Sequence, residues 1–193
     1  AVLPFDNYST AEEDQYFSDG MTEVIIANLA KVKDLKVISR TSVMEYKNTT
    51  KKLKDIAKEL GVAHILEGSI QRANGRVRVV GQLIDADTDE HIWAETYDKK
   101  ESDIFELQSD VAIEIANALK TELTDEVKAR ISEKLTESTI AYEYYLKGNM
   151  HERAGHSKEN LLAAIAEYER AVAIDPDFAE AHAELGRMHV QLK

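Results

Sequence analysis

The stretch that decides the fold of the first part of the chain runs from Val62 to Lys99 and reads VAHILEGSIQRANGRVRVVGQLIDADTDEHIWAETYDK. Asn74-Gly75 is a strong signal for a two-residue hairpin loop, because a type I′ turn needs positive φ at both central residues. With this pair as the loop, the two flanking strands can pair in only one register. That register places Arg72 opposite Val77, Ile70 opposite Val79, Gly68 opposite Gly81 and Leu66 opposite Leu83.

The register separates apolar from polar side chains. One face of the hairpin carries Leu66, Ile70, Val79 and Leu83, and the other carries Glu67, Gln71, Arg78 and Gln82. A slip of one residue would destroy this separation, so the pattern supports the register. The facing glycines leave a gap on the apolar side, where we expect a helix to pack closely. The hairpin is therefore part of a sheet with one face to cover.

Other strands and helices are predicted on both sides of the hairpin. A third strand, Glu90 to Lys99, is expected to return antiparallel after a loop at Ala86 to Asp89. Upstream, a strand at Ala1 to Phe5, a helix at Glu12 to Lys31 and a strand at Leu35 to Ser39 indicate a parallel βαβ unit. One helical turn at Thr41 to Tyr46 and a helix at Leu53 to Leu60, ended by Gly61, follow. A longer helix capped by Asp103 carries Ile104, Leu107, Val111, Ile115 and Leu119 at helical spacing.

Composition restricts the class of protein. The chain has 193 residues, of which 44% are hydrophobic and 31% charged, as in ordinary globular proteins. Its formal net charge of -12 argues against direct contact with nucleic acid or with an anionic membrane surface. No apolar run approaches the length of a membrane span, and without cysteine there is no disulfide or thiol chemistry. Because the chain starts at Ala1 inside a strand-like segment and stops at Lys193 within a helical pattern, we expect it to be a piece of a longer protein.

The composition changes after about Glu122, where Ala, Glu, Lys, Leu and Tyr replace glycine and strand formers. Helices are predicted at Thr139 to Arg153, Glu159 to Ile174 and Phe178 to Leu192. We therefore expect an α/β domain with a mixed sheet over residues 1–122, a solvent-facing helical linker over 123–137, and an all-α segment over 138–193.

The all-α segment resembles tetratricopeptide repeats. Counted back from Pro176 as the repeat-closing proline, Ala171, Tyr168 and Ala164 occupy the small, aromatic and small positions of a second repeat helix. The next repeat follows with Ala179, Leu185, Gly186 and His189 at the expected offsets. The first helix of the earlier repeat fits if the loop 154–158 carries about four extra residues. Gly148 then takes the glycine position, although Lys147 stands where a leucine is usual.

The α/β part resembles the TolB amino-terminal domain, or FlgO family, of bacterial regulators. The resemblance covers nearly all of residues 1–122 and rests on VLPF, YFSDGMTE, ISRTSVMEYK, ELGVAHILEGSIQR, QLIDADTDEHIWAETYD and DIFELQSDVA. It implies a compact α/β sandwich with helices on one or both faces of the sheet. It also implies an output module elsewhere in the protein, namely an adenylate cyclase, a CadC-type DNA-binding domain or a kinase. A membrane helix between output module and this domain would favour the extracytoplasmic side.

No motif predicts catalysis, a metal or a cofactor. His151-Glu152 is followed by a second histidine at position 156, one residue too far for a zinc-protease helix. His182 and His189 are two helical turns apart and cannot share a metal. Asp85, Asp87 and Asp89 alternate as in a calcium loop, but the glycine and the final glutamate of that motif are missing, which favours an acidic turn. Trp93 and Tyr97 are expected either to form an aromatic recognition patch or to cover the sheet beneath a helix.

Two surfaces remain as candidate sites. In repeats of this type the first helices line a groove that accepts peptides, and the repeat frame turns six residues toward it: Tyr142, Tyr145, Asn149, Arg153, Glu180 and Arg187. The alternative for the tyrosines is packing between helices. A small anion or ligand site is the second candidate, formed by Asp6, Asn7, Arg40 and Thr41 at strand ends and a helix start. Its alternative is simple capping by Thr41 or Ser42.

These observations favour a non-catalytic regulatory region that binds a protein or peptide partner. Partners of basic or aromatic character would suit the acidic chain, and a homodimer is a further arrangement that we keep open. The competing hypothesis is a sensory domain for a small ligand, which requires a cavity of several hundred Å³ in the α/β part.

Overall fold

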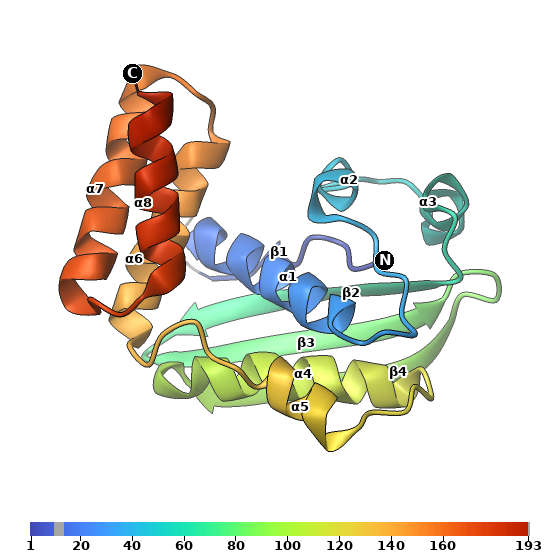
Figure 1. Ribbon diagram of the computed structural model, residues 1–193. Coiled ribbons are helices and arrows are strands. Elements are labelled where there is room, and N and C mark those ends of the chain that lie inside the picture. Colours follow the sequence, from blue (N-terminus) through green and yellow to red (C-terminus); the bar gives the residue numbers. More distant parts are fainter. Residues whose placement is uncertain (10–13, 193) are drawn as a thin grey trace. The chain divides into compact units, whose positions relative to one another are not determined.

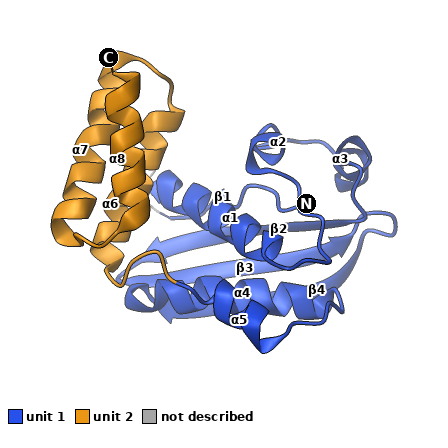
Figure 2. Ribbon diagram, viewed as in Figure 1, with its two compact units in different colours: residues 1–133 blue, residues 134–193 orange. Residues whose placement is uncertain are grey.

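The computed structural model describes residues 1–9 and 14–192 and divides into two compact units, residues 1–133 and 134–193 (Figure 2). The first unit contains a four-stranded mixed sheet with helices, and the second contains three helices (Figure 1). The expected fold class, an α/β part followed by an all-α segment, is confirmed. Each unit is described separately below.

The sheet of the first unit has the order β1-β2-β3-β4. Its strands are β1 (Asp6–Asn7), β2 (His64–Ala73), β3 (Arg76–Asp85) and β4 (Glu90–Lys100). The β2–β3 register is the predicted one, including Gly68 opposite Gly81 and Leu66 opposite Leu83. Asn74 and Gly75 have φ values of 53° and 71°, as a type I′ turn requires. The third strand is also confirmed, with a register shift between Leu83 and Ile84.

One face of the sheet is covered by α1 (Gln15–Ala30) and α4 (Ile104–Ala118), which also pack against each other. The apolar residues of the hairpin face that the sequence predicted are buried against them, as are Met21 and Ile25 of α1. A 3-10 turn, Glu101–Asp103, leads into α4; the side chain of Asp103 makes no capping bond and accepts from the Ser102 hydroxyl instead. The short helix α5 (Asp125–Ile131) follows, and its Ile131 is buried beside α4. Residues 123–133 therefore belong to the compact α/β unit.

A helix covers one end of the opposite face. Helix α3 (Leu53–Leu60) packs Ile56 and Ala57 against Ile65, Leu3 and Ala86. Ile65 adjoins Leu66 in β2, and neighbouring residues in a strand point to opposite faces, so α3 lies across the sheet from α1 and α4. The helix ends at Gly61, whose φ of 65° is the left-handed value expected of a terminating glycine. The one-turn helix α2 (Arg40–Met44) precedes it.

Two predictions for the N-terminal part were wrong. Residues 35–39 form no strand and pair with none among the described residues, so the predicted βαβ unit does not exist in that form. The parallel neighbour of β1 is β2, and within the segment 1–5 only Val2 makes a bridge, to Leu66. Strand β2 takes the place alongside the N-terminal segment that residues 35–39 were expected to occupy. The first residues of the predicted helix at Glu12 lie outside the described part of the chain.

The gap above the facing glycines is filled by an aromatic ring rather than by a helix. A Cβ atom on Gly68 would lie 2.3 Å from the Phe5 ring and 2.1 Å from the carbonyl oxygen of Val80. Phe5 is fully buried, and its backbone N–H donates to the Thr22 hydroxyl of α1 at 3.0 Å. The glycine therefore lets the N-terminal segment lie directly on the sheet.

The second unit consists of α6 (Thr139–Arg153), α7 (Lys158–Ile174) and α8 (Ala179–Gln191), close to the predicted bounds. Helix α7 packs against both α6 and α8. The hydroxyls of Ser138 and Ser157 cap the first two helices by accepting the N–H groups of Ala141 and Asn160. Among the described residues, no helix of either unit has the length and apolar character that a membrane crossing would need.

Candidate functional site

The interior of the repeat unit is organised around Tyr168 of α7. Its ring fills the space beside Gly148 of α6, where a Cβ atom would lie 2.4 Å from the ring. Its hydroxyl donates a hydrogen bond of 2.7 Å to Oδ1 of Asn149. Burial, reinforced by the nearby carboxylate of Glu152, raises the pKa of Tyr168, so the hydroxyl keeps its proton. The small positions Ala164 and Ala171 are fully buried on either side of the tyrosine along α7, as the repeat pattern predicts.

An ion pair joins the surfaces of α6 and α8. Arg187 of α8 lies 2.6 Å from Glu152 of α6 and also pairs with Glu184 on its own helix. The hydrogen bond to Glu152, more than any other cause, raises the pKa of the Arg187 guanidinium. The Arg187 side chain is 42% exposed, so this group holds α6 to α8 and still faces solvent.

The six groove residues predicted from the repeat frame fall into two sets. Tyr142 and Asn149 are only 2% and 4% exposed and belong to the interior. Tyr145 is half-buried among aromatic rings, with centroid distances of 6.4 Å to Tyr142, 5.9 Å to Tyr168 and 5.0 Å to Phe178. The accessible members are Arg153, Glu180 and Arg187, together with the exposed part of Tyr145. Packing between helices thus accounts for Tyr142, and the accessible surface is mainly charged.

The other sequence candidates have structural explanations. Oδ1 of Asp85 accepts the N–H groups of Asp87 and Thr88 at 2.9 and 3.1 Å, which lowers the pKa of Asp85 and makes this segment an acidic turn. His182 bonds to the carbonyl oxygen of Pro176. Within residues 1–9 and 14–192, no three acidic or histidine side chains gather as metal ligands would.

Trp93 and Tyr97 lie on the face of β4 that α4 covers. The Trp93 ring is 3.0 Å from the position of a Cβ atom on Gly81, and both aromatic side chains are half-buried. Burial, together with Glu114 and Asp110 of α4, raises the pKa of Tyr97 to about 12. These contacts fit the interpretation that the two rings cover the sheet beneath a helix.

The four residues of the predicted anion site do not line one common cavity. Asp6 borders a cavity of about 550 Å³ beside α3, but neither Arg40 nor Thr41 lines it. Arg40 instead lies 3.9 Å from Glu23 of α1, and Oδ1 of Asn7 accepts the N–H of Ser9. No side chain caps α2, which begins after Ser39, so the alternative of capping by Thr41 or Ser42 was wrong.

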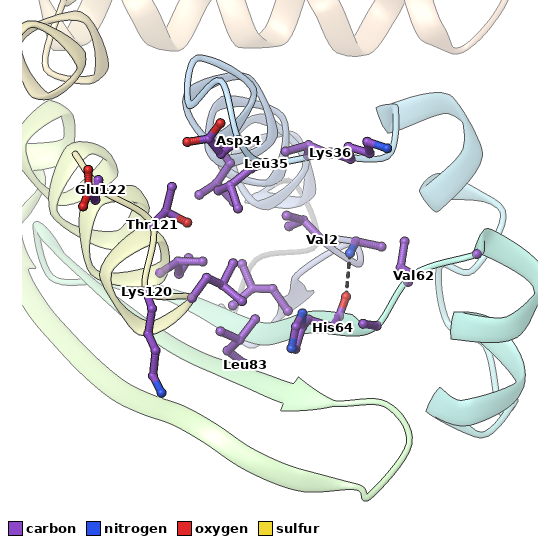
Figure 3. Close-up of a pocket in the computed structure, with 18 residues that line it drawn as sticks. Val2, Asp34, Leu35, Lys36, Val62, His64, Leu83, Lys120, Thr121 and Glu122 are labelled. Carbon is purple, nitrogen blue, oxygen red and sulfur yellow. Dashed lines mark hydrogen bonds between the residues drawn. The ribbon is translucent and has the colours of Figure 1, made fainter. Parts of the chain in front are cut away.

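A larger cavity, which the sequence did not predict, opens between the ends of α1 and α4 and the start of β2 (Figure 3). Its volume is about 600 Å³. Leu66, Leu83 and Ile115 form part of its floor, and Leu35 and Val37 contribute to its wall. The one available signal was the apolar alternation of Leu35 and Val37, which we interpreted as a strand.

An α/β domain joined to helical repeats defines the class of this protein, and comparison with known proteins defines the family. Residues 1–116 match the second domain of HilA/YgeH-like transcriptional regulators, and residues 153–193 match the tetratricopeptide repeat. The chain belongs to the family of HilA/YgeH-like second domains, followed by a tetratricopeptide repeat. The resemblance to TolB-like domains of regulators agrees with this assignment.

The chain spans about a third of the length of a curated relative that it matches. It is 40% identical over 188 residues to the protein named "Putative adenylate cyclase 3" of Rhizobium meliloti (strain 1021); the match covers 96% of this chain but only 31% of that protein.

Among solved structures, lipoprotein GNA1162 of Neisseria meningitidis has a TM-score of 0.45 at 16% identity, covering 64% of this chain and 96% of that one. The PelC dodecamer of Paraburkholderia phytofirmans has a TM-score of 0.39 at 13% identity, covering 63% and 86%.

Proposed function

We propose that this chain is a non-catalytic regulatory region of a signalling protein and that it binds a protein or peptide through the surface shared by α6 and α8. The tetratricopeptide repeat is a protein-interaction module, and this supports a binding role. The observation that carries the location is the Arg187–Glu152 ion pair, which fixes α6 against α8 while leaving polar groups in solvent.

The partner that fits this surface is a segment with basic and aromatic side chains. Glu180 and Glu184 supply carboxylates on α8. The exposed part of Tyr145 offers an aromatic edge, and its ring lies 5.0 Å from that of Phe178, the residue before α8. A formal net charge of -12 for the chain would steer basic partners toward it and repel acidic ones. In this proposal the packed tyrosines stiffen the surface, so little ordering is needed on binding.

The test measures fluorescence polarisation of labelled peptides with the full 193-residue chain. Basic, aromatic-containing peptides are expected to bind more tightly than acidic peptides of the same length. Glu180→Gln should weaken binding because it removes one of the carboxylates that the surface offers to a basic partner. Glu169→Gln is the matched control, since it removes a carboxylate from an exposed position of α7, outside the proposed surface. Equal binding by both variants and wild type, or a preference for acidic peptides, would overturn the proposal.

The output of such a region would lie outside these 193 residues. The relative named as an adenylate cyclase supports a cyclase as the attached module, and a DNA-binding domain or a kinase are the alternatives that the resemblance implies. We further propose that the region lies on the extracytoplasmic side of a membrane-anchored regulator. An alkaline phosphatase fusion to the full-length protein tests this, because that enzyme is active only outside the cytoplasm; an inactive fusion would refute it.

A second candidate function is sensing of a small ligand. The specific observation in its favour is the cavity of about 600 Å³ in the α/β unit, whose chemistry is developed below.

A further inference from the structure

The floor of the larger cavity is made of core residues. Leu66 and Ile115 are each 1% exposed and Leu83 is 2% exposed, yet all three border a space of about 600 Å³. Protein interiors are normally packed without voids much larger than a water molecule, which occupies roughly 30 Å³. A cavity of this size instead falls in the range of small-molecule sites, about 300–1,000 Å³.

The rim of the same cavity is polar. Asp34 and Lys36 follow α1, and Lys120, Thr121 and Glu122 follow α4 (Figure 3). Two acidic and two basic residues therefore lie on the rim, and their formal charges cancel. The Ala1 amino group also lines the cavity, and it is mainly uncharged at neutral pH because burial lowers its pKa to about 6. Such a rim can form hydrogen bonds with the polar group of a ligand, without a net charge that would favour an anion or a cation.

The wall between floor and rim is formed by an unpaired segment. Leu35 and Val37 are half-buried and line the cavity, and the structure gives residues 35–39 no strand partner. Residues 35–37 therefore line the cavity in place of the strand that the sequence predicted.

We propose that this cavity binds a small amphiphile whose apolar body lies on Leu66, Leu83 and Ile115 and whose uncharged polar head lies at the rim. A medium-length alkyl alcohol or a one- or two-ring aromatic with one hydroxyl or amide has the required shape. This inference is independent of the partner surface proposed for the repeat unit.

The test uses the full chain and the neutral dye N-phenyl-1-naphthylamine, which fluoresces in apolar surroundings. The wild type is expected to enhance dye fluorescence, with energy transfer from Trp93, the only tryptophan, which pairs with the cavity residue Leu83. Decanol should displace the dye at lower concentration than decanoate or decylamine. Val37→Trp should weaken dye binding about tenfold or more by filling the space.

Ile92→Trp is the matched control, because it adds the same indole on β4 at a residue that is 40% exposed and does not line the cavity. Circular dichroism checks that each variant folds, and Thr121→Trp, from a different wall segment, replaces Val37→Trp if that variant does not. Absence of dye binding, or equal binding by wild type and both cavity variants, refutes the site. Displacement by decanoate or decylamine as readily as by decanol refutes the uncharged head.

Discussion

Both units pack an aromatic ring against a glycine, but they differ in how far apart the two residues lie along the chain. In each, a glycine allows an aromatic ring to lie against the backbone of a neighbouring element: Gly68 receives Phe5 in the α/β unit, and Gly148 receives Tyr168 in the repeat unit. Gly148 and Tyr168 lie on consecutive helices, so a repeat pattern predicts their contact. Phe5 and Gly68 are brought together only by the tertiary fold, since α1, α2 and α3 lie between them in the chain.

The two units also differ in the kind of candidate site that their packing forms. The repeat unit buries Tyr168, Ala164 and Ala171 in its interior. The α/β unit leaves a cavity of about 600 Å³ where its segments, which are distant in sequence, converge. Local repeats thus form the outer surface on which we propose partner binding, whereas long-range convergence forms the cavity in which we propose a ligand site.

The largest expected effect comes from removing the ring that joins the N-terminal segment to the sheet. Phe5→Ala should lower the free energy of unfolding of the α/β unit by about 3–5 kcal/mol, because a fully buried ring leaves a cavity. Trp93 fluorescence reports this unit alone, since no other tryptophan is present. Denaturant titration should show the Trp93 transition shifting to lower denaturant. An unchanged midpoint would show that Phe5 does not hold the sheet.

Gly148→Ala tests the corresponding contact in the repeat unit. The added methyl group would meet the Tyr168 ring, so we expect a loss of about 1–3 kcal/mol from overpacking. Gly186→Ala is the matched control, because open space surrounds that helical glycine and alanine should stabilise the helix by up to about 1 kcal/mol. Helical circular dichroism at 222 nm measures both. If Gly148→Ala also shifts the Trp93 transition equally, the two units do not unfold separately and the comparison fails.

Tyr168→Phe tests the hydrogen bond from the Tyr168 hydroxyl to Asn149 in the repeat interior. It keeps the ring but removes the hydroxyl that donates to Asn149, leaving a buried amide oxygen without that donor. The expected loss is about 1–2 kcal/mol, smaller than that of a ring deletion. Thermal unfolding followed by circular dichroism provides the measurement. Asn149→Ala in the same background should then cost little more, and a fully additive loss would argue against the bond.

The smallest expected effect is a pH-dependent change in Tm that arises from Asp98, on the exposed face of the sheet. Hydrogen bonds from Arg78 and Arg76 lower the pKa of Asp98, so its ionised form stabilises the fold at neutral pH. This contribution is lost as the pH falls below about 4, the ordinary value, toward the lowered pKa. Asp98→Asn should therefore lose less Tm than wild type between neutral and acid pH. Asp87→Asn, which removes the same charge from the opposite end of the hairpin, should retain the wild-type slope.

Much of the first unit could be predicted from local patterns. The Asn74-Gly75 turn and the alternation around it predicted every pair of the β2–β3 register that we derived. The third strand and the helices from Leu53 onward were also predicted, because their periodicity and end signals are local. Residues 35–39 were not, since an apolar alternation looks the same whether a segment pairs in a sheet or lines a cavity.

The candidate surface of the repeat unit was likewise predicted only in part. The repeat frame identified α6 and α8 as one surface, but it could not separate accessible Arg187 from buried Tyr142 and Asn149. That distinction depends on the rotation of each helix against its neighbour, which single-sequence periodicity leaves uncertain by a residue.

By itself, the sequence determined the hairpin register, the division into an α/β part and helical repeats, and the acidic character that suits basic partners. The tertiary structure alone decided which strand lies beside the N-terminal segment, which aromatic ring fills the gap at Gly68, and that a cavity opens beneath Leu35 and Val37. The physical reason is that turns and periodicity act between residues a few positions apart, whereas strand order and cavities depend on competition among segments that meet only in the folded chain.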